Sequence, residues 1–138
     1  MKTPFWKFPS GIFSTPISPD YCRSNFKSMI RLEHIGIAVK DLSAANDLFK
    51  KLLGSEHYKI EEVASENVLT SFFQTGESKV ELLEATSPDS TIAKFIEKRG
   101  EGIHHVAFEV EDILAEMQRL EKEGFTLLNA TPKQGADN

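Results

Sequence analysis

The chain has 138 residues with 21 acidic and 16 basic side chains, a formal net charge of −5, and this length suits one domain with a substantial core. The acidic excess without a long basic run argues against nucleic acid, and no apolar stretch approaches the roughly 20 residues of a membrane span, which argues against membrane insertion. Cys22 is the only cysteine, which excludes disulfide scaffolds and cysteine zinc sites.

Residues 1–28 differ in composition from the rest of the chain. They hold four basic residues against one acid, and four of the six prolines. They show neither helical nor strand periodicity and no continuous apolar core of a secretory signal. This composition predicts a disordered or non-native leader with a faint likeness to an organelle transit peptide. We expect a cytoplasmic protein, with the mitochondrial matrix as the alternative if the leader directs import.

The first periodic segment, residues 31–39, predicts a strand that carries a histidine on an unusually open face. In a strand, His34 shares its face with two small residues, Gly36 and Ala38. Larger side chains normally pack around a histidine in a core. The open space therefore marks His34 as a candidate ligand.

The following segments complete a first module over residues 29–85. Apolar residues at helical spacing predict one helix, and runs rich in β-formers separated by turn residues predict three strands. The helix is expected over residues 42–53, and the strands over 57–63, 68–74 and 78–84. The element order of this module is β-α-β-β-β.

A linking segment with a short helix, residues 86–102, leads into a second copy of the first strand and helix. Residues 32–42 (LEHIGIAVKDL) align without a gap with residues 103–113 (IHHVAFEVEDI), which places His34 against His105. A strand is expected over 103–110, a helix over 112–123 and the start of a further strand over 125–128. The sequence therefore predicts one α+β domain over 29–138, built from paired βαβββ modules of which the second, 103–138, is incomplete.

The internal repeat predicts a metal site between the modules. Two similar modules related by a pseudo-twofold would bring His34 and His105 together. Glu81 lies in the last strand of the first module, and a carboxylate buried there without a partner would cost several kcal/mol. The alternatives for Glu81 are an ion pair with a neighbour such as Lys79, or exposure on an edge strand.

The same symmetry predicts a fourth ligand that the chain does not include. At equal spacing, the counterpart of Glu81 would lie about 14 residues beyond Asn138. Two imidazoles with carboxylates suit Co, Mn, Ni, Zn or Fe(II).

The other two histidines are not candidate ligands. Strand alternation predicts that His104 faces away from His105 and has a packing or hydrogen-bonding role. His57 is expected at the surface.

Three segments carry a family resemblance: residues 32–39 (LEHIGIAV), 79–83 (KVELL) and 87–110 (SPDSTIAKFIEKRGEGIHHVAFEV). They resemble the vicinal-oxygen-chelate superfamily (glyoxalase and bleomycin-resistance-like proteins) and, within it, the methylmalonyl-CoA epimerases. The resemblance implies that His34, Glu81 and His105 bind a divalent metal, Co²⁺ first, with Mn²⁺, Ni²⁺ or Zn²⁺ as alternatives. It implies an acyl-CoA substrate, a homodimer at full length, and interconversion of (R)- and (S)-methylmalonyl-CoA through a metal-stabilised enolate.

The resemblance leaves the catalytic residues unknown. The closing strands of the family, with a glutamate that is both ligand and candidate base, are missing, so we expect the chain by itself to be inactive. Some relatives carry a glutamate base on the third strand, where this sequence has Thr70. Glu66 is near that place in the sequence, but proximity alone does not assign it.

Other functions remain open at this stage. A glyoxalase-type lyase acting on a glutathione hemithioacetal would share the ligand set. A ring-cleaving dioxygenase usually needs two tandem domains, for which the chain is too short. A metabolite- or drug-binding protein of the same fold would not need the two histidines and Glu81. An inactive fragment is the remaining alternative.

Overall fold

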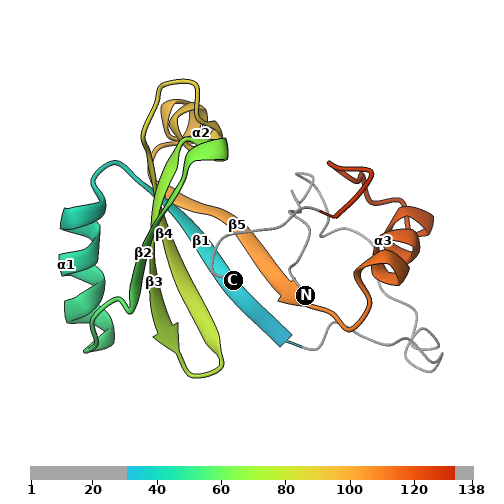
Figure 1. Cartoon of the computed structure of the whole chain (residues 1–138), viewed down its shortest axis with the longest axis horizontal. Coiled ribbons are helices and arrows are strands. Elements are labelled where there is room, and N and C mark those ends of the chain that lie inside the picture. The colour runs from blue at the N-terminus through green and yellow to red at the C-terminus, as the bar shows by residue number, and fades with distance from the viewer. Residues whose placement is uncertain (1–30, 133–138) are drawn as a thin grey trace.

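The structure, a computed structural model, describes residues 31–132, which form a five-stranded mixed sheet with three α-helices (Figure 1). The strand order is β2-β3-β4-β1-β5. In chain order the elements are β1 (Arg31–Val39), α1 (Leu42–Leu53), β2 (Lys59–Val63), the short 3₁₀ helix η3 (Ala64–Glu66), β3 (Val68–Thr75), β4 (Ser78–Ala85), α2 (Thr91–Arg99), β5 (Gly102–Glu109) and α3 (Ile113–Lys122). The leader expected over residues 1–28 lies outside the described residues.

The first module has the predicted β-α-β-β-β order, and the alternation of apolar residues builds a core on each face of its sheet. One core lies between the sheet and α1, with Val39, Phe73 and Leu82 buried in it. The other lies under α2, where Ala38 and Leu83 pack with residues of that helix. Figure 1 shows α1 along the sheet and α2 across one end of it. The same strand periodicity that buries Ala38 therefore places His34 on the α2 side.

The repeat is visible in the helix starts. Asp41 Oδ1 accepts a hydrogen bond from the amide of Ala44 at 2.9 Å, and Asp112 Oδ1 accepts from the amides of Leu114 and Ala115 at 3.0 Å. An aspartate at this position satisfies backbone donors that the helix itself leaves free. Both repeat copies therefore enter their helices in the same way.

The two copies of the repeated strand lie next to each other. β1 pairs with β4 in parallel on one side and with β5 in antiparallel on the other. Gly36 lies opposite both Glu81 of β4 and His105 of β5. This register makes β1 the common wall of a site that draws on three strands.

The second module differs from its prediction after α3. Residues 125–128 are not a strand. A strand needs a hydrogen-bonded neighbour. The counterpart in the first module, β2, pairs with β3, whereas none of the described strands pairs with residues 125–128. Leu127 instead packs on Val110, Ile113 and Met117. Among the described residues, no helix combines the length and apolarity that a membrane crossing demands.

Candidate metal centre

Three side chains from β1, β4 and β5 converge on one point. His34 Nε2 lies 2.8 Å from His105 Nε2, and Glu81 Oε2 lies 3.4 Å from His34 Nε2 and 3.2 Å from His105 Nε2. Each residue offers one ligand atom, and all three atoms lie within 4.8 Å of one another. The convergence predicted from the repeat is thus present in the geometry.

The size and chemistry of this triangle fit a divalent ion. Imidazole nitrogen and carboxylate oxygen bind such ions at roughly 2.0–2.2 Å, so two ligands at right angles would lie about 3 Å apart. The three separations, 2.8, 3.2 and 3.4 Å, bracket that value. Two neutral imidazoles and one carboxylate also match the donor set that first-row divalent metals prefer.

The glycine opposite His105 makes the approach of the two histidines possible. A Cβ built on Gly36 would lie 2.1 Å from His105 Cε1, far inside van der Waals contact. The small residues expected to leave space beside His34 do so, and the ring of His105 fills that space. Only glycine fits here, because any other residue would displace a candidate ligand.

Glu81 is buried and held by a neighbouring strand. Its exposed fraction is 5 %, and β4 lies between β3 and β1 in the sheet, so exposure on an edge strand is ruled out. The hydroxyl of Thr70 donates to Glu81 Oε1 at 3.1 Å, which leaves Oε2 directed at the imidazoles. Lys79, the alternative partner, forms an ion pair with Glu33 at 2.5 Å.

Glu33 is a site residue that the sequence analysis missed. Its Oε2 contacts Nδ1 of His34, while its Oε1 pairs with Lys79. Burial raises the pKa of the Glu33 carboxyl, but the hydrogen bonds from Lys79 and His34 together hold that pKa below its usual value. The adjacency of Glu33 to a candidate ligand was the available signal, and strand alternation argued against using it.

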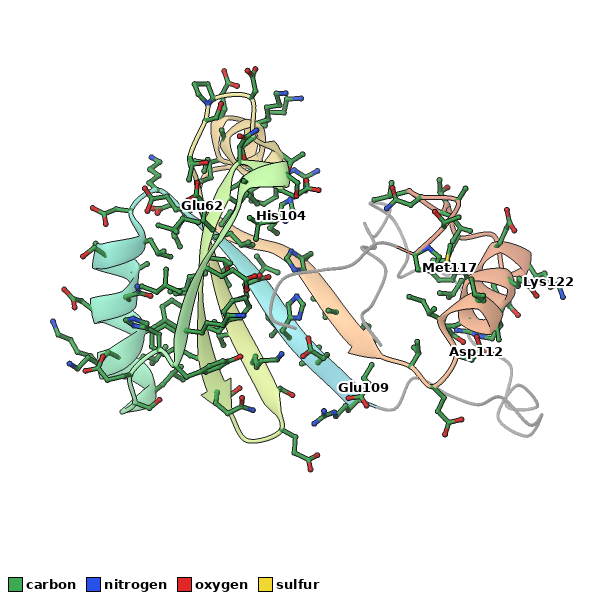
Figure 2. The ribbon with its side chains drawn as sticks, viewed as in Figure 1. Glu62, His104, Glu109, Asp112, Met117 and Lys122 are labelled. Atoms are coloured by element: carbon green, nitrogen blue, oxygen red, sulfur yellow. The ribbon has the colours of Figure 1, made fainter. Side chains whose placement is uncertain are left out.

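The prediction that His104 faces away from His105 is wrong. The two Nδ1 atoms lie 3.1 Å apart, and the ring of His104 meets Phe95 of α2 edge-on at 5.0 Å between centroids. Strand alternation fails because the register of β5 shifts at this point. Figure 2 shows His104 at the end of β5 near α2, away from Glu109 at the other end. The packing role expected for His104 is present.

The remaining singled-out residues lie apart from the triangle. His57 is half-buried, with its ring 5.8 Å from that of Phe73, so it is less exposed than expected. Glu66 is exposed on η3. Thr70 is fully buried, and its hydroxyl supports Glu81 instead of facing solvent.

Comparison with known proteins agrees with this architecture. A model of the Glyoxalase/Bleomycin resistance protein/Dioxygenase superfamily matches residues 33–138. The ethylmalonyl-CoA/methylmalonyl-CoA epimerase of Cereibacter sphaeroides is 41% identical over 108 residues, covering 77% of this chain and 81% of the relative. The mitochondrial methylmalonyl-CoA epimerase of Mus musculus is 34% identical, covering 90% of this chain and 70% of the relative.

Solved structures of epimerases have a similar fold. A variant of the methylmalonyl-CoA epimerase of Streptomyces coelicolor, solved with 2-nitronate-propionyl-CoA, superposes with a TM-score of 0.72 at 32% identity, covering 79% of this chain and 80% of that chain. The family model spans most of the described residues. More than a third of the aligned residues of this chain are identical in each of the two epimerases. The chain therefore belongs to the glyoxalase, bleomycin resistance protein and dioxygenase superfamily, the vicinal-oxygen-chelate proteins.

Proposed function

We propose that the chain is a divalent-metal-dependent epimerase that interconverts (R)- and (S)-methylmalonyl-CoA. The observation that carries the proposal is the convergence of three side chains from three strands. They are His34 of β1, Glu81 of β4 and His105 of β5. Relatives at 41% and 34% identity are named as epimerases of this substrate class. A metal-free binding protein would have no use for such a triangle.

We assign the three ligand roles to His34 Nε2, Glu81 Oε2 and His105 Nε2, with Co²⁺ as the first candidate and Mn²⁺, Ni²⁺ or Zn²⁺ as alternatives. When bound, a divalent ion supplies Lewis-acid stabilisation of the negative charge that develops on a thioester carbonyl oxygen after proton removal. Glu81 contributes one negative charge to the site, and the two imidazoles contribute none in their neutral, ligating form.

The chain's own residues prepare this site before any ligand arrives. Thr70 holds one oxygen of Glu81, Gly36 admits the ring of His105, and the pairing of β1 with β5 sets the spacing of the histidines. Epimerisation also needs a group that removes the proton on one face and a group that returns one on the other. The Thr70 hydroxyl donates to a ligand and is a poor base, so we assign it no proton transfer.

The decisive assay follows exchange of the hydrogen at the carbon between the two carbonyl groups of methylmalonyl-CoA in heavy water, with Co(II) supplied. Metal-dependent exchange that disappears in His34→Ala supports the proposal, and His57→Ala serves as the matched histidine control. Turnover of a glutathione hemithioacetal without exchange of the methylmalonyl-CoA hydrogen would move the function to the lyase alternative.

The presence of a base is tested in the same assay. Hydrogen exchange by this chain with Co(II) would show that its own residues supply the essential base. No exchange by a chain that binds Co(II) would agree with the inactivity expected from the sequence. We also propose that the protein forms a homodimer. Analytical ultracentrifugation of the same samples should then give twice the mass of one chain.

A further inference from the structure

Two irregularities in the pairing of β1 with β5 occur at equivalent places in the repeat. Between Leu32 and His34 the register shifts by one residue, which makes Glu33 the additional residue on β1. A second shift beside Gly36 makes His104 the additional residue on β5. In the repeat alignment these two positions correspond. Each module therefore has a β-bulge one residue before its candidate ligand histidine.

A bulge changes where the additional side chain points. In a regular strand, the residue before a ligand faces the opposite side of the sheet. A bulge breaks that alternation and re-aims a side chain. Both additional residues use this freedom in the same way: Glu33 contacts Nδ1 of His34, and Nδ1 of His104 lies 3.1 Å from Nδ1 of His105.

Each contact engages the ring nitrogen that does not face the other candidate ligands. The Nε2 atoms of His34 and His105 point into the triangle, 2.8 Å apart. A histidine that donates its Nδ1 hydrogen to an acceptor is held in the tautomer whose Nε2 lone pair can bind a metal. The acceptor also fixes the rotation of the ring, so both features of a preorganised ligand follow from one hydrogen bond.

The two side chains that contact these Nδ1 atoms are themselves anchored, by different means. Glu33 Oε1 pairs with Lys79 at 2.5 Å, so the carboxylate is held between a cation and the ring of His34. His104 is held by edge-on packing against Phe95, with the rings at 90°. A carboxylate acceptor forms a stronger hydrogen bond than a neutral imidazole, and the two half-sites are therefore unequal.

We propose that Glu33 and His104 are positioning residues that use the paired bulges to hold His34 and His105 ready for a divalent metal. The inference rests on the proposed metal site and adds the two residues that orient its imidazoles. Removing such a partner weakens metal binding by roughly 10- to 100-fold in other proteins. We expect a loss in the upper part of that range for Glu33→Ala and in the lower part for the His104 variant.

The test is a Co(II) titration of the full chain, followed by the visible absorption of the bound ion. Glu33→Ala removes the acceptor, whereas Glu33→Gln keeps an oxygen that can accept from Nδ1 and should recover most of the affinity. His104→Phe keeps the packing against Phe95 but removes the ring nitrogen. Glu62→Ala, which replaces an exposed glutamate on β2, is the matched control and should bind Co(II) like the unmodified chain.

A second readout separates orientation from stability. In the Zn(II)-loaded protein, heteronuclear NMR should show a slowly exchanging Nδ1 hydrogen on His34. Glu33→Ala should lose this signal, and Glu33→Gln should retain it. Thermal unfolding of the metal-free variants checks that each is folded, and if Glu33→Ala does not fold, the glutamine variant and Lys79→Met, which frees the far oxygen of Glu33, carry the comparison.

The outcomes distinguish the two proposals. Failure of the unmodified chain to bind Co(II) would overturn the metal site itself. Tight binding by that chain together with affinities within twofold for Glu33→Ala and His104→Phe would overturn the positioning roles and leave the metal site intact. A Glu33→Gln variant as weak as Glu33→Ala would show that hydrogen-bond acceptance is not what Glu33 contributes.

Discussion

The two modules contribute unequally to one site. The first has a four-stranded sheet with a buried core on each face, and it supplies His34 and Glu81. The second supplies His105 from β5, and its own apolar cluster includes Ile113 and Met117 of α3. Figure 1 shows α3 beyond the end of β5. His105 is therefore held in place mainly by the pairing of β5 with β1.

This difference shows which contacts position the candidate ligands of each module. The candidate ligands of the first module are positioned by a sheet that packs on both sides. The candidate ligand of the second is positioned by register against β1, by the absence of a side chain at Gly36 and by contact with His104. The following variants break or sharpen this comparison, beginning with the largest expected effect.

Removing either histidine should abolish measurable Co(II) binding, because two donors remain where three converged. His34→Ala and His105→Ala are expected to have the same effect on metal binding despite their different modules. Calorimetric titration measures the binding, and circular dichroism should show that both variants are folded. His57→Ala is the control. Undiminished binding by either ligand variant would contradict the assignment of that histidine.

Adding one methyl group at Gly36 should damage the second module's ligand more than the first. Gly36→Ala places a Cβ 2.1 Å from His105 Cε1, so the ring must move or the strands must separate. Overpacking of this kind costs about 1–3 kcal/mol of stability. Chemical denaturation measures the loss, and Co(II) titration should show that binding is lost as well.

A double-mutant cycle localises the Gly36 effect. Adding His105→Ala to Gly36→Ala removes the ring that the methyl group meets, so the stability should recover, and the two changes should be non-additive. Full additivity would show that Gly36→Ala acts through a contact other than His105.

Removing the hydrogen bond that supports Glu81 tests a candidate ligand of the first module. Thr70→Val preserves shape but withdraws the hydroxyl from Glu81 Oε1, which should cost about 1–3 kcal/mol of metal-free stability and weaken Co(II) binding. Thr70→Ser keeps the hydroxyl and should behave nearly like the unmodified chain. The comparison uses denaturation and metal titration on both variants. Equal losses in both would point to packing and not to the hydrogen bond.

The smallest effects should come from the equivalent helix caps. Asp41→Ala and Asp112→Ala should each cost about 1 kcal/mol. The backbone amide at the start of α1 also donates to Glu84 of β4 at 2.7 Å, which ties that helix to the sheet. Hydrogen exchange should therefore show the Asp41 effect spreading into the sheet and the Asp112 effect confined to α3. Identical exchange patterns would remove this distinction between the modules.

Much of the fold followed from local patterns in the chain. The order of elements through α3 and the convergence of three candidate ligands were predicted from periodicity and the repeat. These features depend on interactions between residues close in sequence, or on a symmetry visible in the sequence. Their physical causes, side-chain alternation and helix-end hydrogen bonds, act within each segment.

The errors that concern strands share one cause, which is pairing between segments far apart in sequence. Residues 125–128 have the composition of a strand, yet strand formation depends on a partner elsewhere. His104 was assigned to the wrong face of the strand and Glu33 was not considered. Side chains alternate between faces only where the register of the two paired strands is regular. The positions at which β1 and β5 fall out of step were not apparent from either strand's sequence.

The amino-acid sequence by itself determined which residues could bind a metal and which elements carry them, because ligand chemistry and segment periodicity are properties of the chain. Only the tertiary structure decided how the imidazoles are oriented. That depends on two register shifts between β1 and β5 and on a glycine whose missing side chain leaves room for a ring from another strand. Both arise from the steric fit between strands that are far apart in sequence.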